Sequence, residues 1–201
     1  MKKSIFIILL FFYALSISAN NEQLLRRIDR KYQNFRTFEA SIVQENFFSQ
    51  INYTLSSTGN VYMQGESVVI EYNQPNYQFI KMINNEITIF SQLENTAIIT
   101  QDSSLFTQAL LQFSNILNND LKFIEQNNNI VIFEVLKLPV STIQNMRLYI
   151  NERNDLIEKV SYNENSNNTV TIEFNNQKFN QTLSRPLNSF ILPEGVIIIR
   201  N

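Results

Sequence analysis

Apolar and polar residues alternate along several short stretches of the chain. Phe38, Ala40 and Ile42 fall on one side of an extended chain, with polar residues between them. The same period of two recurs over residues 146–151 and 169–174. This period is typical of strands that are buried on one face only. The chain is therefore predicted to form an antiparallel sheet with one apolar face.

Turn-forming residues separate the predicted strands. Residues 56–59 and 64–67 each contain a glycine and are predicted to be turns or bulges. Asn84-Asn85 predicts a tight hairpin, because asparagine tolerates left-handed backbone geometry. Residues 127–129, three asparagines, predict another hairpin. Successive hairpins at this spacing predict a meander of antiparallel strands.

A helical period marks residues 22–35, where Leu24, Ile28 and Tyr32 recur at four-residue intervals. This spacing predicts a helix whose apolar stripe packs on the sheet. Four basic residues lie mainly off the stripe, namely Arg26, Arg27, Arg30 and Lys31. They form either a solvated face or a face that meets an acidic partner or an anionic membrane surface.

A second helical stripe interrupts the strands after residues 102–104, whose side chains can cap a helix. Its apolar positions are Leu105, Phe106, Ala109, Leu110, Phe113, Ile116 and Leu117. Such a helix must lie across an open sheet or across the end of a barrel. It either fills the core or acts as a movable lid over an apolar cavity.

Residues 1–19 have the pattern of a secretory signal peptide. Lys2 and Lys3 precede the apolar run 5–15, and small residues follow up to Ala19. The run is short for a bilayer of ~30 Å, which needs about 20 residues. We predict cleavage near Ala19, the alternative being an uncleaved anchor. Residues 20–201 are predicted to form a single domain.

The composition of the chain limits the kinds of functional site that it can form. The chain has no cysteine and no histidine, which excludes disulfides, zinc-thiolate sites and the usual general base. We expect no cofactor and no metal. Loss of Lys2 and Lys3 would change the net charge of −2 to −4, which argues against a nucleic-acid partner.

Several short motifs, taken in order, resemble the LolA family over residues 22–199. They are Phe38-x-Ala40-x-Ile42-x-Gln44, Gly59-x-Val61, Ile70-Glu71-Tyr72-x-x-Pro75 and Phe190-x-x-Pro193-x-Gly195-Val196. The resemblance implies a half-open, unclosed antiparallel β-barrel with an N-terminal helix and a lid helix over the cavity. One departure is that no Arg-Pro pair follows the Gly-x-apolar strand. The corresponding positions hold Gly65 and Glu66 or, by another placement, Gln64 and Gly65.

The resemblance also implies a function. LolA proteins are periplasmic carriers that hold the acyl chains of lipoproteins. The implied partners are acylated lipoproteins as cargo, an inner-membrane lipoprotein-releasing ABC transporter and an outer-membrane lipoprotein receptor. We expect a monomer with no catalytic residues.

The predicted lipid-binding residues are apolar side chains of the strands and of the lid. They are Val61, Met63, Val68, Ile70, Tyr72, Phe79, Ile87 and Ile89 on the early strands, Met146, Leu148 and Ile150 on the later ones, and Leu105, Phe106, Leu110 and Phe113 on the lid. Each of them is equally compatible with ordinary core packing.

Two other functions are compatible with the sequence. A similar barrel could sense lipids or lipoproteins and signal through a protein partner. An enzyme could use paired carboxylates such as Glu71 and Glu86, although nothing in their spacing singles them out.

Overall fold

A computed structural model of the 201-residue chain describes residues 21–101, 121–138, 143–164 and 166–200. These residues include one α-helix over 21–33, twelve strands and the short 3-10 helix η1 (Leu187–Ser189). The predicted signal peptide and the predicted lid lie outside the described residues. Four predicted lipid-binding residues lie there as well, namely Leu105, Phe106, Leu110 and Phe113.

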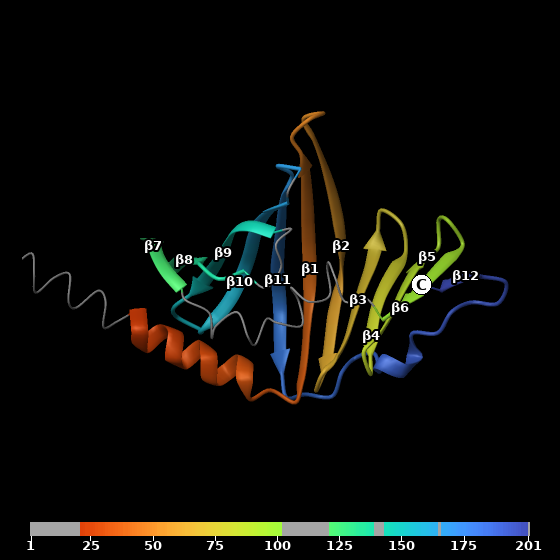
Figure 1. Ribbon diagram of the computed structural model, residues 1–201. Helices are drawn as coiled ribbons and strands as arrows, with labels where there is room; N and C mark the ends of the chain where they lie inside the picture. Colours follow the sequence, from red (N-terminus) through yellow and green to blue (C-terminus); the bar gives the residue numbers. More distant parts are fainter. Residues whose placement is uncertain (1–20, 102–120, 139–142, 165, 201) are drawn as a thin grey trace, which may run out of the picture.

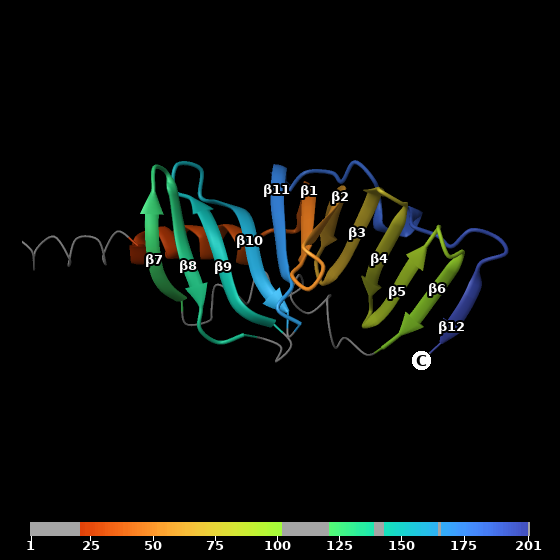
Figure 2. The same cartoon turned by 90° about the horizontal axis from the view of Figure 1, so that it is seen from above.

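The twelve strands form one sheet. In chain order they are β1 (Thr37–Phe48), β2 (Tyr53–Gln64), β3 (Ser67–Gln74), β4 (Gln78–Ile83), β5 (Glu86–Ser91), β6 (Thr96–Thr100), β7 (Leu121–Asn127), β8 (Ile130–Val135), β9 (Ile143–Asn151), β10 (Leu156–Glu164), β11 (Thr169–Phe179) and β12 (Ile197–Arg200). Their order across the sheet is β12-β6-β5-β4-β3-β2-β1-β11-β10-β9-β8-β7, as Figure 2 shows. All neighbours are antiparallel except β12, which runs parallel to β6. Because β12 and β7 are the outer strands, the sheet is not closed, which confirms the predicted unclosed barrel.

The first strand lies in the middle of the sheet. β1 pairs with β2 on one side and with β11, from the C-terminal part of the chain, on the other. In Figure 1 the hairpin of β1 and β2 projects beyond the neighbouring strands. β1 therefore joins the two halves, β2–β6 and β7–β11.

The predicted turns are partly confirmed. Asn84 and Asn85 have φ of 52° and 63° in the hairpin between β4 and β5, and Asn128 has φ of 53° between β7 and β8. Residues 56–59 were predicted to be a turn or a bulge, and they lie inside β2, where the pairing with β3 is irregular between Thr58 and Gly59. The bulge is therefore confirmed and the turn is not. A Cβ atom on Gly59 would lie 1.8 Å from the carbonyl oxygen of Glu71. The close approach of β3 thus requires a glycine there.

The sheet has an apolar cluster on each face. We call the face that contacts the helix the helix face; its buried residues include Val61, Ile70 and Leu148 together with Leu24 and Ile28 of the helix. The opposite face of β2–β6 carries a smaller cluster of Tyr62, Val69, Phe79, Phe90 and Ala97, which packs with Leu187 and Phe190. We call residues 183–196, which cover this cluster, the tail, and the face beneath them the tail face.

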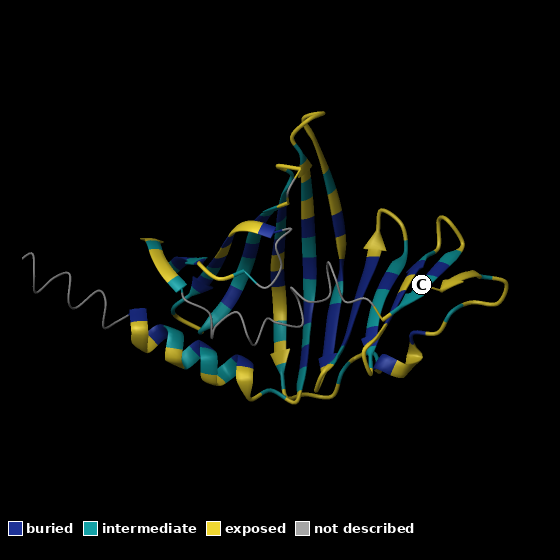
Figure 3. Ribbon diagram, in the orientation of Figure 1, coloured by how far each residue is buried: buried dark blue, intermediate teal, exposed yellow. Residues whose placement is uncertain are grey.

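The two clusters explain the different sequence patterns of the strands. β3 is buried at five consecutive positions from Val68 to Tyr72 because both of its faces are covered. β10 and β11 instead alternate between buried and less buried positions, seen as bands in Figure 3. Alternation in the sequence therefore marks the half of the sheet with one covered face.

Candidate functional site

A row of apolar side chains crosses the helix face toward one edge of the sheet. Val61, Ile70, Ile80, Ile89 and Ile98 are successive cross-strand partners on β2 to β6, so they share one face. Val61 and Ile70 are fully buried, whereas Ile80 and Ile98 are half-buried and Ile89 is 37% exposed. The apolar face thus continues outward beyond the packed core.

Most of the predicted lipid-binding strand residues lie together on this face. The buried cluster of the helix face contains Val61, Met63, Val68, Ile70, Tyr72, Ile87, Met146, Leu148 and Ile150. Ile89 lies on the same face at its exposed margin. The grouping of Phe79 with them is wrong: Phe79 pairs with Glu71 and packs against Phe90 and Phe190 on the tail face.

The helix over 21–33 covers the β9–β11 part of this face and is held there by Tyr32. The Tyr32 hydroxyl donates to Oε1 of Gln177 at 2.8 Å and accepts from the backbone N–H of Ile157 at 2.9 Å. Nε2 of Gln177 in turn donates to the carbonyl oxygen of Ile157 at 2.8 Å. The pairing of β10 with β9 is irregular here, since its register shifts just after Ile157. Burial raises the pKa of Tyr32.

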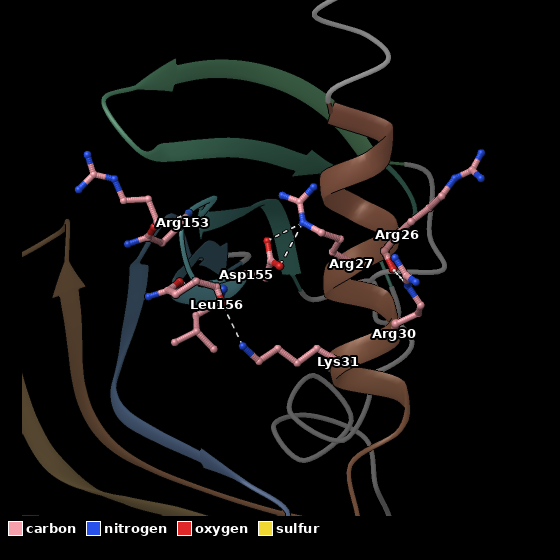
Figure 4. A network of polar contacts seen from close by, with 9 residues as sticks. Arg26, Arg27, Arg30, Lys31, Arg153, Asp155 and Leu156 are labelled. Atoms are coloured by element: carbon pink, nitrogen blue, oxygen red, sulfur yellow. Dashed lines mark hydrogen bonds and ion pairs between the residues drawn. The ribbon is translucent and has the colours of Figure 1, made fainter.

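Two of the four basic residues on the helix are partnered with the sheet, as Figure 4 shows. Nε of Arg27 lies 3.0 and 3.1 Å from the two carboxylate oxygens of Asp155. Nζ of Lys31 donates to the carbonyl oxygen of Asn154 at 2.8 Å. Arg26 pairs with Glu22 within the helix. Arg27 and Lys31 thus attach the helix to the turn between β9 and β10 while they stay partly exposed to solvent.

The tail is attached to the opposite face through Arg185. Its guanidinium forms an ion pair with the buried carboxylate of Glu71 and lies 3.9 Å from the centre of the Phe190 ring. Nζ of Lys81 donates to the Phe190 carbonyl oxygen at 2.9 Å. No sequence motif indicated this pair, because its members come from distant parts of the chain.

The structure does not bring together the two carboxylates considered for catalysis. Glu71 is opposite Phe79 on β4, whereas Glu86 is opposite Ile83, four residues further along the same strand. At a rise of about 3.3 Å per residue, Phe79 and Ile83 lie about 13 Å apart along β4. Glu71 and Glu86 lie further apart than this, because they are on the strands to either side of β4. Glu71 serves instead as the partner of Arg185.

Two hollows of the described surface lie away from the predicted lipid-binding residues. One cavity of about 680 Å³ lies among Arg36, Gln64 and Asn180, and one of about 600 Å³ lies among Tyr149, Lys159 and Glu173. Neither is lined by a predicted lipid-binding residue. Most of the predicted strand residues are buried, so acyl chains could reach them only if the helix-face cluster opened.

Two further features bear on the site. In the described part of the chain, no group of three or more acidic, histidine or cysteine side chains could hold a metal ion. None of the helices in that part has the length and apolar character needed to cross a bilayer. The expectations of no cofactor and no catalysis stay predictions.

Solved structures identify the fold. No family model matches the sequence, and a comparison with curated proteins gives no match. An uncharacterized conserved protein from Thermus thermophilus superposes with a TM-score of 0.57 at 12% identity, covering 90% of this chain and 99% of that one. A domain from Vibrio parahaemolyticus, named for outer membrane lipoprotein sorting, superposes with a TM-score of 0.50 at 9% identity, covering 85% and 97%. The chain has the fold of these two proteins. The fold that the resemblance implies is thereby found in a protein named for lipoprotein sorting.

Proposed function

We propose that this LolA-like protein is a periplasmic carrier that binds the acyl chains of lipoproteins released from the inner membrane and delivers them to the outer membrane. The observation that carries the proposal is the apolar row on the helix face, which runs from buried Val61 and Ile70 to exposed Ile89. The name of the Vibrio parahaemolyticus domain supports the same class of cargo.

The physical need for such a carrier follows from the cost of exposing acyl chains. Each CH₂ group transferred to water costs about 0.8 kcal/mol, so a lipid with two or three chains does not leave a bilayer unaided. An apolar face that is packed when empty must give up its own contacts to accept these chains. That cost lowers the net affinity, which makes release to the next protein possible.

The proposed partners act before and after the carrier. An inner-membrane lipoprotein-releasing ABC transporter would load it, and an outer-membrane lipoprotein receptor would unload it. A monomer suits both transfers, because the open margin of the sheet near Ile89 would stay accessible.

Two matched substitutions test the proposal. Ile89→Glu places a charge on the helix face, and Ile191→Glu places one on the tail, where Ile191 is 73% exposed. Both positions are exposed enough for the variants to fold. Purified protein is incubated with spheroplasts, and the soluble lipoprotein complexes are measured. We expect Ile89→Glu to release at most about a tenth of the wild-type amount, since a charge on the acyl-binding face costs several times RT, and Ile191→Glu to match the wild type.

Failure of the wild type to release any lipoprotein would contradict the carrier function. Recovery of a signalling protein in place of lipoproteins, in a pull-down from the same cells, would favour the sensing alternative. Equal release by both variants would show that the helix face is not the acyl-binding surface.

A further inference from the structure

A small polar group interrupts the apolar helix face near the projecting end of β1. Tyr72 on β3 donates its hydroxyl proton to Oε1 of Gln44 on β1 at 2.6 Å. β2 lies between these strands, and Tyr72 is opposite Gly59, whose lack of a side chain lets the ring cross. Nε2 of Gln44 donates to Oδ1 of Asn46 at 3.0 Å, which leaves the Asn46 amide group as a donor.

Two further hydroxyls belong to this group. Ser57 on β2 is the direct cross-strand partner of Gln44 on β1. Asn46 on β1 and Tyr162 on β10 both pair with Val170, on the strand β11 that lies between them. The two side chains are only 7% and 5% exposed. Tyr162 also adds to the rise in the pKa of Tyr72, after the larger effect of burial, so the two phenols lie near each other.

The Ser57 and Tyr162 hydroxyls lack partners in the described chain. Neither hydroxyl makes a hydrogen bond in the described residues. Every fully buried side-chain oxygen or nitrogen of these residues does have a hydrogen-bond partner. Both hydroxyl oxygens therefore retain some contact with solvent. Buried polar groups normally find partners, so two hydroxyls that share an apolar face and lack them suit a ligand acceptor.

Charge restricts the acceptor to a neutral group. The polar group of Gln44, Asn46, Ser57, Tyr72 and Tyr162 contains no cation. Burial and, to a smaller extent, the negative charge of Glu164 raise the pKa of Tyr162. An anionic acceptor such as a free carboxylate would meet the same repulsion, whereas a neutral carbonyl oxygen would not.

We propose that Asn46, Ser57 and Tyr162 form a subsite for the ester carbonyl oxygens of a diacylglyceryl group. The inference rests on the proposed function, because the acyl chains would lie on the apolar side chains around the subsite. The donors would fix where the glyceryl group sits and thereby how far each chain reaches along the helix face. Lipoproteins and phospholipids both carry such esters, so the two sources must be distinguished by experiment.

The test compares two labelled lipopeptides that differ only in their linkage. One carries two palmitoyl esters on the glyceryl-cysteine and the other carries two alkyl ethers, which lack the carbonyl oxygens. Binding is followed by fluorescence anisotropy for the wild type, for Ser57→Ala/Tyr162→Phe, and for the control Ser56→Ala/Tyr149→Phe. Ser56 precedes Ser57 in β2 and is exposed. Tyr149 lies on β9, the strand next to that of Tyr162, and its ring contacts Lys159.

We expect the wild type and the control to bind the ester about 3- to 10-fold more tightly than the ether for each hydrogen bond gained. The test variant should lose most of this preference, keeping at most the part that the Asn46 amide supplies, and its thermal midpoint should not fall, because the lost hydroxyls have no partner in the described protein. Unlabelled phosphatidylethanolamine should compete more weakly than the ester lipopeptide. Equal competition would assign the esters to phospholipid and overturn lipoprotein as their source.

Other outcomes would count against the subsite. An ester preference that is undiminished in the test variant, or no preference in the wild type, would overturn it while leaving the carrier function intact. Failure to bind either lipopeptide would instead overturn the carrier function, and the subsite with it.

Discussion

The helix and the tail each cover one half of the sheet, but on opposite faces and by different means. The helix over 21–33 covers the β9–β11 half of the helix face and is held by directional hydrogen bonds from Tyr32 and Lys31 to the sheet. The tail covers β2–β6 on the tail face and is held by the Arg185–Glu71 ion pair and by aromatic packing around Phe190.

This difference indicates which part of the molecule can open. On the β9–β11 half, the helix closes the apolar side of the sheet. On the β4–β6 half, the tail closes the other side, and the helix face includes the partly exposed Ile89 and Ile98. We therefore expect a ligand to enter at β4–β6, while the helix stays in place.

The largest effect is expected from removing the side chain that holds the helix. Tyr32→Ala should lower the free energy of unfolding by about 3–5 kcal/mol, because it leaves a cavity and breaks two hydrogen bonds. Tyr32→Phe keeps the ring and should cost about 1–3 kcal/mol, since the Ile157 N–H loses its acceptor. Urea unfolding measures both. A Tyr32→Ala protein as stable as the wild type would show that the helix is not fixed.

An intermediate effect is expected at the tail. Arg185→Ala leaves the buried Glu71 carboxylate without its countercharge and should cost about 2–3 kcal/mol, less than for a fully buried pair because Arg185 is partly exposed. The double variant Arg185→Ala/Glu71→Gln removes the charge as well and should recover part of the loss. If the double variant is less stable than Arg185→Ala, the ion pair does not attach the tail.

The smallest effect concerns pH at the start of the tail. Burial acts against ionisation of Glu39, but hydrogen bonds from Ser184 and Lys178 outweigh it and hold the pKa of Glu39 below its usual value of 4.5. The lowered pKa stabilises the folded protein above pH 4.5, and this stabilisation is lost as the pH falls through the folded-state pKa.

Thermal unfolding of the wild type and of Glu39→Gln, followed from neutral pH into acid, measures this contribution. The wild type should be more stable near neutral pH by at most about 1 kcal/mol, and the difference should vanish in acid. A constant difference at all pH values would show that Glu39 does not act through its charge.

The sequence predicted the half of the sheet that has one covered face. Alternation in β9 and β11 marked strands with one buried side, and paired asparagines marked hairpins. The helical stripe of Leu24, Ile28 and Tyr32 marked the face that packs on the sheet. These signals are local, because each depends only on the period of the element itself.

The other half could not be predicted in the same way. In β3 both faces are buried, so alternation is absent, and nothing in the sequence tells which face Phe79 occupies. The tail has little regular structure, and its ion pair joins residues 114 positions apart. The polar subsite was also missed, because Ser57 and Tyr162 come together only through the order of β2, β1, β11 and β10.

The central position of β1 has a consequence for how the protein matures. Phe38 is opposite Phe179, which follows it by 141 positions, so one side of β1 cannot be paired until the polypeptide has emerged as far as β11. Contacts between such remote segments slow folding, because a long loop must close before they form. A chain exported in the unfolded state would thus complete its sheet only after translocation, and slow emergence of β11 would prolong the time during which β1 is open to aggregation.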